Sequence, residues 1–476
     1  MSKHILSKST YIRSLQCQKS LYLHKHRPFL RDRLSPEQLQ KFRRGTDVGK
    51  TAHGLFPDGI DLTARSPGQY AQKVQETKEA IASGKVNVIY EAAFQYDEVL
   101  IFLDILVKSD DGWTACEVKS SQTLSSVYYA DAALQYYVLK GSGIRISDFL
   151  LFHINPEYIL YEELNPNELF RSESVINLVE NKLNETKIQI ETAKSTLRLK
   201  QSHDIRIGSH CNNPYPCDFK GHCWKNIPKY SILQLTTFDD DDLFDWYHKG
   251  ISDPREVVNL SINETQKSQI DALISRSEYY NLKLATTPFP GPQENYAFVD
   301  VLFSRPAIPV ISGSKPYEYV PVAAAVLHDD QQTDIKYFKN SQEDIISFAA
   351  WIDNILHQFD HLIIFDSIEL LAFWQSELFK STTANQPLSF SSTDKIRSIR
   401  NYLYEIQYFY PGLNFQSDQA ALSLHCTDLP PLTDRHQMIH EATTADHNEN
   451  PSGTGQKILE YLISLQFLYS YISSLK

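Results

Sequence analysis

Residues 102–121 read FLDILVKSDDGWTACEVKSS, and this stretch decides the fold expected for the first half of the chain. Two apolar runs flank a Ser-Asp-Asp-Gly sequence that is typical of a tight hairpin turn. If Asp110 and Asp111 form the turn, Asp104 faces Glu117; a turn one residue later places Asp104 opposite Lys119. Because side chains alternate along strands, either register puts Asp104, Glu117 and Lys119 on one face of the sheet.

This face has the composition of a divalent-metal site. Cross-strand neighbours lie about 4.5–5.5 Å apart, close enough for two carboxylates to share a cation. Mg²⁺ and Mn²⁺ prefer hard oxygen ligands and activate a bound water for attack on a phosphodiester. Lys119 is then suited to orient that water or to offset charge in the transition state. A surface hairpin with an ordinary Asp–Lys pair is the simpler alternative, but the apolar flanks of both strands argue against it.

The surrounding sequence extends this hairpin into an α/β unit over residues 1–228. Strands are expected within residues 87–107 and at DFLLFHI, and the run SVYYADAALQYYVLKGSG predicts a helix that ends at a glycine. A first helix is expected to carry Cys17, and a second, FRRGTDVGKTAHGLF, to carry His53. A long polar helix over about residues 168–200 then leads to a cysteine cluster.

These segments resemble, in order, the motifs of the RecB-type branch of the PD-(D/E)XK nucleases, which have a restriction-endonuclease-like core. The resemblance rests on the His53 helix, the Glu91 strand, LDILV, CEVKSS, and the helix with Gln135, Tyr136 and Tyr137. Leu103 replaces the proline of the family name, at a position that varies in the branch.

The resemblance implies a role for each matching residue. His53, Asp104 and Glu117 would be metal ligands, with the Val118 carbonyl as a further ligand. Lys119 would be the catalytic lysine, and Gln135 with a neighbouring tyrosine would shape the site. Glu91 matches an acidic position of many members. His53 taken alone is more often a structural histidine, so its ligand role rests on the resemblance.

Four cysteines form the other constellation: Cys17 stands alone, and Cys211, Cys217 and Cys223 follow at intervals of six positions. Four thiolates suit either tetrahedral zinc or a cubane cluster. The split arrangement resembles the iron–sulfur RecB-type nucleases and implies a structural 4Fe–4S cluster. The spacing is wider than is usual there, which keeps zinc open as an alternative. The remaining cysteines, Cys116 and Cys426, are expected to be buried thiols.

Aromatic side chains within the cysteine segment are expected to shield such a centre from water; they are Tyr215, Phe219 and Trp224.

The second half of the chain is expected to contain a helical connector at residues 229–285 and another α/β domain at 286–476. Its segments, from YAFVDVLF to the last helix ILEYLISLQFLYSYI, resemble an RNase H-like exonuclease domain of the DEDD type. Asp300 is retained, but Leu302 stands where a glutamate is expected, and Leu465 lies near the expected last aspartate. Asp366 and Glu369 occupy the middle motif. The domain is therefore interpreted as a degenerate exonuclease that serves as scaffold or nucleic-acid guide.

Charge and composition set the expectations for the whole chain. The formal net charge of the 476 residues is −12, yet residues 1–50 hold twelve lysines and arginines and only three acidic residues, a pattern suited to a phosphate backbone. No signal peptide or membrane span is expected, so a cytoplasmic location with reduced cysteines is predicted.

The leading hypothesis is a Mg²⁺- or Mn²⁺-dependent nuclease with an iron–sulfur cluster that acts on DNA in preference to RNA, at single strands or ends. A catalytically silent nucleic-acid-binding or assembly protein, and a zinc-stapled structural protein, are the alternatives. Oligomeric state is left open.

Overall fold

The computed structural model describes residues 4–259, 262–286, 289–291, 293–328, 332–386, 393–411, 432–444 and 452–475. Cys426 lies outside these ranges. The chain folds into two compact units. The first comprises Met1–Ser35, Lys41–Tyr158 and Glu163–Asn226, and the second comprises Pro36–Gln40, Ile159–Glu162 and Ile227–Lys476. The division expected at residues 228 and 285 stays a prediction.

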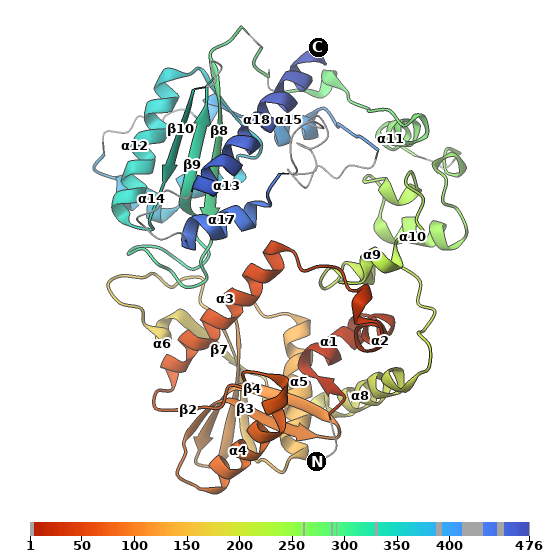
Figure 1. Ribbon diagram of the computed structural model, residues 1–476, viewed down its shortest axis with the longest axis vertical. Helices are drawn as coiled ribbons and strands as arrows, with labels where there is room; N and C mark the ends of the chain where they lie inside the picture. The colour runs from red at the N-terminus through yellow and green to blue at the C-terminus, as the bar shows by residue number, and fades with distance from the viewer. Residues whose placement is uncertain are drawn as a thin grey trace. The chain divides into compact units, whose positions relative to one another are not determined.

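The first unit is built on a mixed seven-stranded sheet in the order β2-β3-β4-β5-β6-β7, with β1 pairing to β4 (Figure 1). Its central hairpin is antiparallel, and β5 pairs in parallel with β6. The strands are β1 (Leu6–Ser7), β2 (Ile60–Asp61), β3 (Val88–Tyr96), β4 (Val99–Ser109), β5 (Gly112–Lys119), β6 (Ile146–Ile154) and β7 (Phe170–Ser174). The strands expected on either side of the hairpin are confirmed.

Register resolves the two alternatives for the hairpin. Ser109 pairs with Gly112 and Ile105 with Cys116, so Asp110 and Asp111 form the turn. Continuing this register by one residue places Asp104 opposite Glu117.

Two helices of the first unit, α4 and α5, make the main helix contacts with the sheet. α5 lies against β3, β4 and β6, and α4 packs on β3. The helices are α1 (Lys8–Gln16), α2 (Gln18–His26), α3 (Pro36–Ala52), α4 (Tyr70–Ala82), α5 (Ser126–Gly141), α6 (Pro166–Leu169), α7 (Ile176–Asn181), α8 (Leu183–Arg198) and α9 (Lys220–Cys223). The first residues of α3, 36–40, belong to the second unit.

Three local expectations for this unit are wrong. Cys17 is not inside a helix, because its extended backbone (φ −161°, ψ 117°) separates α1 from α2. His53 begins a short 3₁₀ turn after α3 ends at Ala52. The single helix expected over residues 168–200 is interrupted, because Phe170–Ser174 pairs with β6 as an edge strand.

The second unit contains a five-stranded mixed sheet in the order β10-β9-β8-β11-β12. β8, β9 and β10 are antiparallel neighbours, and β11 runs parallel to β8 and β12. The strands are β8 (Tyr296–Ser304), β9 (Val320–Leu327), β10 (Thr333–Tyr337), β11 (His361–Ile364) and β12 (Ile396–Ser398).

Helices cover both faces of this second sheet (Figure 1). Alternate β8 residues point into two cores: Phe298 and Leu302 pack with α18, and Val299 and Val301 pack with α12. The helices are α10 (Asp240–His248), α11 (Glu264–Ser275), α12 (Gln342–Gln358), α13 (Ile368–Gln375), α14 (Glu377–Thr383), α15 (Ile399–Glu405), α17 (Arg435–Thr444) and α18 (Ser452–Ser474).

The loop expected over residues 439–456 is corrected at both ends, since α17 extends to Thr444 and α18 begins at Ser452; residues 445–451 lie outside the described ranges. Both units are thus α/β, as expected. Among the helices of the described residues, none is long and apolar enough to cross a membrane.

Candidate active site and cysteine centre

A buried cluster of charged side chains lies where β5 meets α5. The Lys119 ammonium donates to Glu117 Oε1 at 2.8 Å and to Asp131 Oδ2 at 2.6 Å. A second ammonium, from Lys8 at the start of α1, donates to the same Glu117 oxygen at 2.7 Å. The side chains of Glu117 and Asp131 are only 3% and 9% exposed, so these ion pairs lie largely away from water.

Asp104 and Glu91 add two carboxyl groups from the neighbouring strands. The Val118 N–H donates to Asp104 Oδ2 at 2.7 Å, which fixes this carboxylate against β5. Glu91 lies between the pairs Tyr90–Ile105 and Ala92–Leu103, and therefore stands opposite Asp104. Its φ of 53° is uncommon outside glycine and marks a local distortion of β3 at this point.

The electrostatics of the cluster separate these carboxyl groups into two classes. Burial, with the charge of Glu117, raises the pKa of Asp104 to about 6, and burial, with the charge of Asp104, raises the pKa of Glu91 to about 7. Burial also acts to raise the pKa of Glu117, but the ammonium groups of Lys119 and Lys8 outweigh it and hold that pKa well below its usual range. Glu117 is therefore the permanently ionised member.

Several polar atoms of the cluster have no hydrogen-bond partner within the described residues. They are Glu117 Oε2, Asp131 Oδ1 and both amide atoms of Gln135. Gln135 is fully buried on α5, one helical turn after Asp131. Burying polar atoms without partners is costly, so these atoms are available to bind water, a cation or a substrate.

The structure places His53 at the margin of this cluster. Its ring stacks on Tyr90, with centroids 3.9 Å apart and planes 4° from parallel. Burial lowers the pKa of His53, while the charge of Asp61 opposes that shift. Asp61 also acts electrostatically on Glu91. Within the described residues, no hydrogen bond joins the His53 ring to Asp104 or Glu117, so its ligand role stays a prediction.

The tyrosines beside Gln135 point elsewhere. The Tyr136 hydroxyl donates to Glu180 and the Tyr137 hydroxyl to Asp97, each at 2.8 Å. The aromatic ring near Lys119 is instead that of Tyr128, whose centroid lies 5.2 Å from the ammonium. Val118 contributes its N–H to Asp104; the role implied for its carbonyl stays a prediction.

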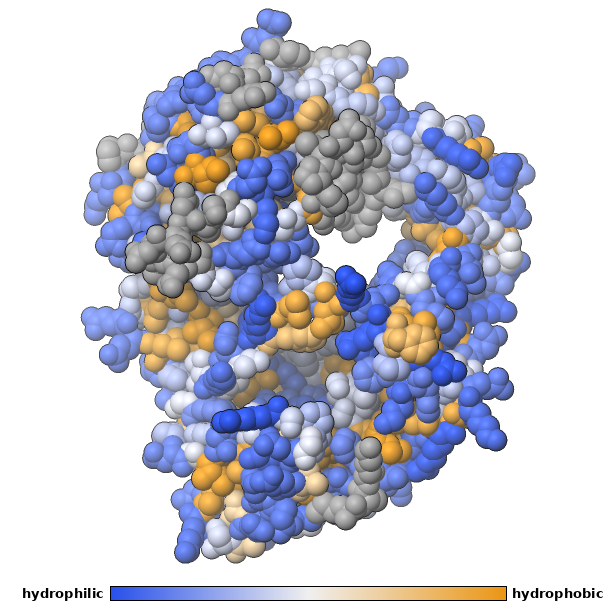
Figure 2. Space-filling model, viewed as in Figure 1, coloured by the Kyte–Doolittle hydropathy of each residue, from blue (hydrophilic) through white to orange (hydrophobic). Residues whose placement is uncertain are grey.

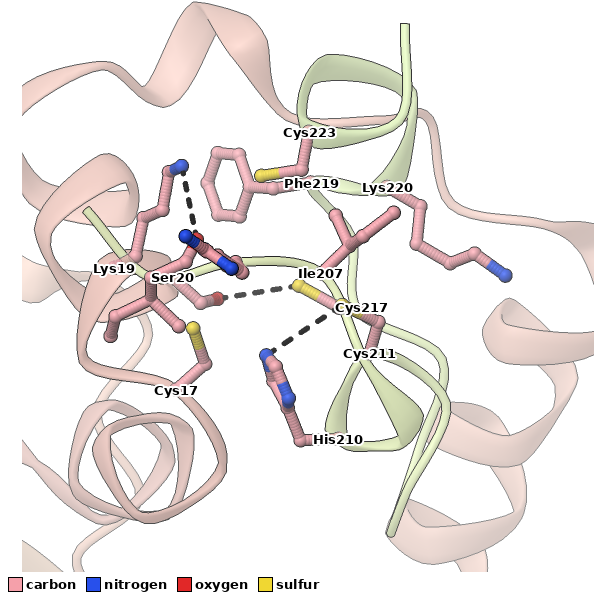
Figure 3. Close-up of a pocket in the computed structure, with 12 residues that line it drawn as sticks. Cys17, Lys19, Ser20, Ile207, His210, Cys211, Cys217, Phe219, Lys220 and Cys223 are labelled. Carbon is pink, nitrogen blue, oxygen red and sulfur yellow. Dashed lines mark hydrogen bonds between the residues drawn. The ribbon is translucent and has the colours of Figure 1, made fainter. Parts of the chain in front are cut away.

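All four cysteines of the predicted set line one cavity, although Cys17 is nearly 200 residues from the others (Figure 3). Space not filled by protein atoms amounts to about 350 Å³, part of it open to solvent. Apolar groups of Ile207 and the fully buried Phe219 also line the cavity. Burial raises the pKa of Cys17, and the nearby Cys217 and Cys211 add to the rise.

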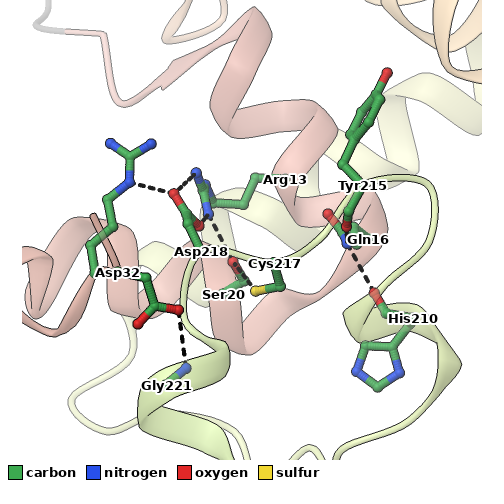
Figure 4. A network of polar contacts seen from close by, with 10 residues as sticks. Arg13, Gln16, Ser20, Asp32, His210, Tyr215, Cys217, Asp218 and Gly221 are labelled. Atoms are coloured by element: carbon green, nitrogen blue, oxygen red, sulfur yellow. Dashed lines mark hydrogen bonds and ion pairs between the residues drawn. The ribbon is translucent and has the colours of Figure 1, made fainter. Parts of the chain in front are cut away.

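Ion pairs hold the cysteine segment against α1 (Figure 4). Asp218, next to Cys217, accepts from the Arg13 guanidinium, with Nη2 to Oδ2 at 3.0 Å, and also pairs with Arg31. The Gln16 amide donates to the carbonyl groups of His210 and Tyr215 at 2.9 and 2.7 Å. The segment is thereby fixed to the second half of α1 at two points.

The expected aromatic shield is only partly correct. Phe219 lines the cavity, but the Tyr215 ring extends away from Cys217 and His210 and is 48% exposed (Figure 4). The charges of Lys119 and Asp131 act on the pKa of the Tyr215 hydroxyl, so this side chain lies toward the carboxylate cluster. Trp224 is absent from the cavity wall and lies under the Lys220 ammonium, 4.6 Å from the ring centroid.

The cysteine cavity and the carboxylate cluster offer ligands for different kinds of metal centre. Four thiols around one cavity have the chemistry of a zinc or iron–sulfur site, and the carboxylate cluster has that of a hard divalent ion. Over the residues that the structure describes, no three His, Cys, Asp or Glu side chains converge closely enough to hold a metal ion as they stand.

No protein-family model matches the chain, and no curated protein matches it. Assignment of the site therefore depends on its own residues.

In the second unit, Asp300, Asp366 and Glu369 line one cavity with Arg400 and Arg435. Arg435 donates to Asp300 Oδ1 at 2.6 Å and to the Val301 carbonyl at 2.8 Å. Arg400 pairs with Asp366. These two carboxylates are thus paired with arginines, and the two positions expected to have lost their acids, Leu302 and Leu465, are fully buried in one core.

Sequence reasoning missed Lys8, Asp131, Asp61 and Asp218. Asp131 had a detectable signal, because a charged residue four positions before Gln135 shares its helix face. Lys8 had none, since it approaches Glu117 only after β1 pairs with β4 and turns into α1.

Proposed function

We propose that the protein is a Mg²⁺- or Mn²⁺-dependent deoxyribonuclease of the RecB type, with a structural 4Fe–4S cluster in its first unit. One observation carries the proposal. Glu117 and Asp131 are buried on either side of Lys119, and each retains an oxygen atom with no hydrogen-bond partner among the described residues. A hydrated divalent cation meets this need, because it supplies positive charge and ordered water together.

Roles follow from position and from the family resemblance. Asp104 and Glu117 would hold the ion, with His53 and the Val118 carbonyl as further ligands by resemblance. When bound, the ion supplies Lewis acidity and a water of lowered pKa. Lys119 fixes the orientation of Glu117 and offsets negative charge that develops on a phosphodiester. Glu91 and Gln135 border the same pocket from β3 and α5.

Surface charge supports nucleic acid as the substrate. In residues 25–50, the side chains of Lys25, Arg27, Arg33, Arg43 and Lys50 are exposed. Phe29 and Phe42 lie among them and are 76% and 58% exposed. Hydrophilic residues dominate the face of the first unit seen in Figure 2, with apolar patches between them. Exposed cations interleaved with aromatic rings suit a single strand, whose bases stack and whose phosphates need neutralising.

The cysteine cavity supports the cluster as a staple. Cys17 comes from the junction of α1 and α2, and the other three come from residues 211–223. A cluster bound to all four would close a loop of almost 200 residues, an arrangement that stabilises a domain by restricting its unfolded chain. The second unit is proposed to be a degenerate RNase H-like domain that acts as scaffold or nucleic-acid guide.

The test is cleavage of labelled single-stranded DNA, duplex DNA and RNA in Mn²⁺. Wild-type protein is expected to cut single-stranded DNA fastest, and Lys119→Ala to lower the rate by about a hundredfold or more. Lys194→Ala is the matched control, because Lys194 is a buried lysine paired with Asp97 elsewhere in the unit.

Equal rates for wild type and Lys119→Ala would overturn the enzyme proposal. Retained nucleic-acid binding would then favour the catalytically silent alternative.

A further inference from the structure

Lys8 reaches the carboxylate cluster from outside the hairpin that forms it. β1 pairs in parallel with the first residues of β4, and α1 begins at the next residue, Lys8. The Lys8 ammonium donates to Glu117 Oε1 at 2.7 Å and to the Phe102 carbonyl at 3.2 Å. Its side chain is 26% exposed, compared with 14% for Lys119.

The protein's own cations offset only part of the negative charge in this pocket, because four carboxyl groups face two ammonium groups. The carboxyl groups are Asp104 from β4, Glu117 from β5, Asp131 from α5 and Glu91 from β3, and the cations are Lys119 and Lys8. Lys8 interacts electrostatically with every other charged member of the cluster: Glu117, Asp131, Asp104, Lys119 and Glu91. Lys119 bridges Glu117 and Asp131, whereas Lys8 contacts Glu117 alone among the carboxylates of the described residues.

We propose that Lys8 is the resident counter-cation of this pocket, which holds Glu117 in place in the metal-free protein and competes with the divalent ion for it. The inference rests on the proposed function. Lys8 and Lys119 already bring two ammonium groups to Glu117 Oε1, and a divalent ion at Oε2 would add further positive charge to a poorly solvated site. Lys8, the more exposed of the two lysines, therefore opposes binding of the ion by electrostatic repulsion. Lys8 is thus a positioning residue that sets the affinity for the metal.

Mn²⁺ binding to the purified full-length protein, measured by calorimetry, tests this role. Lys8→Met removes the charge and keeps an unbranched side chain of similar length. It is expected to tighten Mn²⁺ binding by about tenfold and to lower the melting temperature measured with a chelator. Lys8→Arg keeps the charge, so its Mn²⁺ affinity is expected to stay within about twofold of wild type.

Two further variants make the result specific. Lys194→Met removes a buried lysine that is paired with Asp97, and it is expected to lower the melting temperature without changing Mn²⁺ affinity. Lys8→Gln retains a donor for the Phe102 carbonyl and repeats the charge removal if the methionine variant does not fold.

The outcomes separate the two proposals. Unchanged or weaker Mn²⁺ binding in both Lys8→Met and Lys8→Gln, with wild type still binding, overturns the counter-cation role and leaves the nuclease proposal standing. Failure of wild type to bind Mn²⁺ overturns both.

Discussion

Oε1 of Glu117 accepts hydrogen bonds from the ammonium groups of Lys8 and Lys119, whereas Oε2 has no partner in the described residues. This asymmetry separates its two functions, since Oε1 is held by lysines and Oε2 is left for a ligand. Asp104 and Glu91 lack such cations at contact distance within the same described ranges, and their pKa values are raised to about 6 and about 7. Neighbouring carboxyl groups thereby differ in charge near neutral pH.

Glu91 gives a pH-dependent prediction. A carboxyl whose pKa is higher in the folded than in the unfolded chain stabilises the fold at low pH and loses this contribution as the pH rises through the folded value. In wild type, this stability is lost as the pH rises from 4.5, the ordinary pKa of the Glu91 carboxyl, to about 7, its pKa in the folded protein. Glu91→Gln has no carboxyl to ionise and so avoids the loss. Without metal, wild type and variant should have similar unfolding free energies near pH 4.5, with the variant more stable by roughly 1–3 kcal/mol above pH 7.

Urea unfolding in a chelator at both pH values measures this difference. The prediction fails if the difference between wild type and Glu91→Gln is the same at the two pH values.

At the scale of elements, α1 joins the two candidate sites. Lys8 begins the helix at the carboxylate cluster, and Cys17 follows its last residue at the cysteine cavity. Arg13, between them, pairs with Asp218 of the cysteine segment. A helix of nine residues is a short, stiff connection, so whatever fixes Cys17 also fixes the position of Lys8.

Cys17→Ser tests the cysteine centre at this scale. A serine hydroxyl is a poor ligand for iron, so the variant is expected to lose most of its iron and sulfide and its broad visible absorbance after anaerobic purification. Its melting temperature should also fall, because the loop closed by the cluster opens. Cys116→Ser is the matched control: this fully buried thiol lies outside the cavity, and its iron content should not change.

Stoichiometric zinc in a colourless wild-type preparation would contradict the iron–sulfur assignment. Full iron content in Cys17→Ser would remove Cys17 from the ligand set.

At the scale of the whole molecule, the two units pair their buried carboxylates with different cations, lysine in the first and arginine in the second. In the first, lysines contact Glu117 and leave one of its oxygens without a partner in the described residues. In the second, Arg435 donates to Asp300 Oδ1 and to the Val301 carbonyl, and Arg400 pairs with Asp366; Asp300 Oδ2, like Glu117 Oε2, has no partner among the described residues. An arginine in two such contacts is a rigid, permanently charged partner that suits structure better than exchange.

Asp300→Asn therefore should leave the rate of DNA cleavage in Mn²⁺ within about twofold of wild type, while lowering the unfolding free energy by about 1–3 kcal/mol through loss of the Arg435 pair. Glu117→Gln should lower the same rate by about a hundredfold or more. Loss of cleavage in Asp300→Asn with an unchanged rate in Glu117→Gln would instead assign catalysis to the second unit.

The sequence by itself determined the local part of this protein. Strand alternation and turn chemistry placed Asp104, Glu117 and Lys119 on one face, because these depend on residues only a few positions apart. It left the hairpin register open, and it wrongly placed Cys17 within a helix, since helical spacing does not reveal where a chain breaks to reach a distant partner.

Only the tertiary structure decided which distant residues complete the sites. Lys8 joins Glu117 through β1–β4 pairing, Asp131 joins Lys119 through the packing of α5 on the sheet, and Cys17 joins Cys211 through the docking of residues 205–223 on α1. Such contacts depend on how whole elements bury their apolar faces against each other, and no pattern of neighbouring residues contains that information.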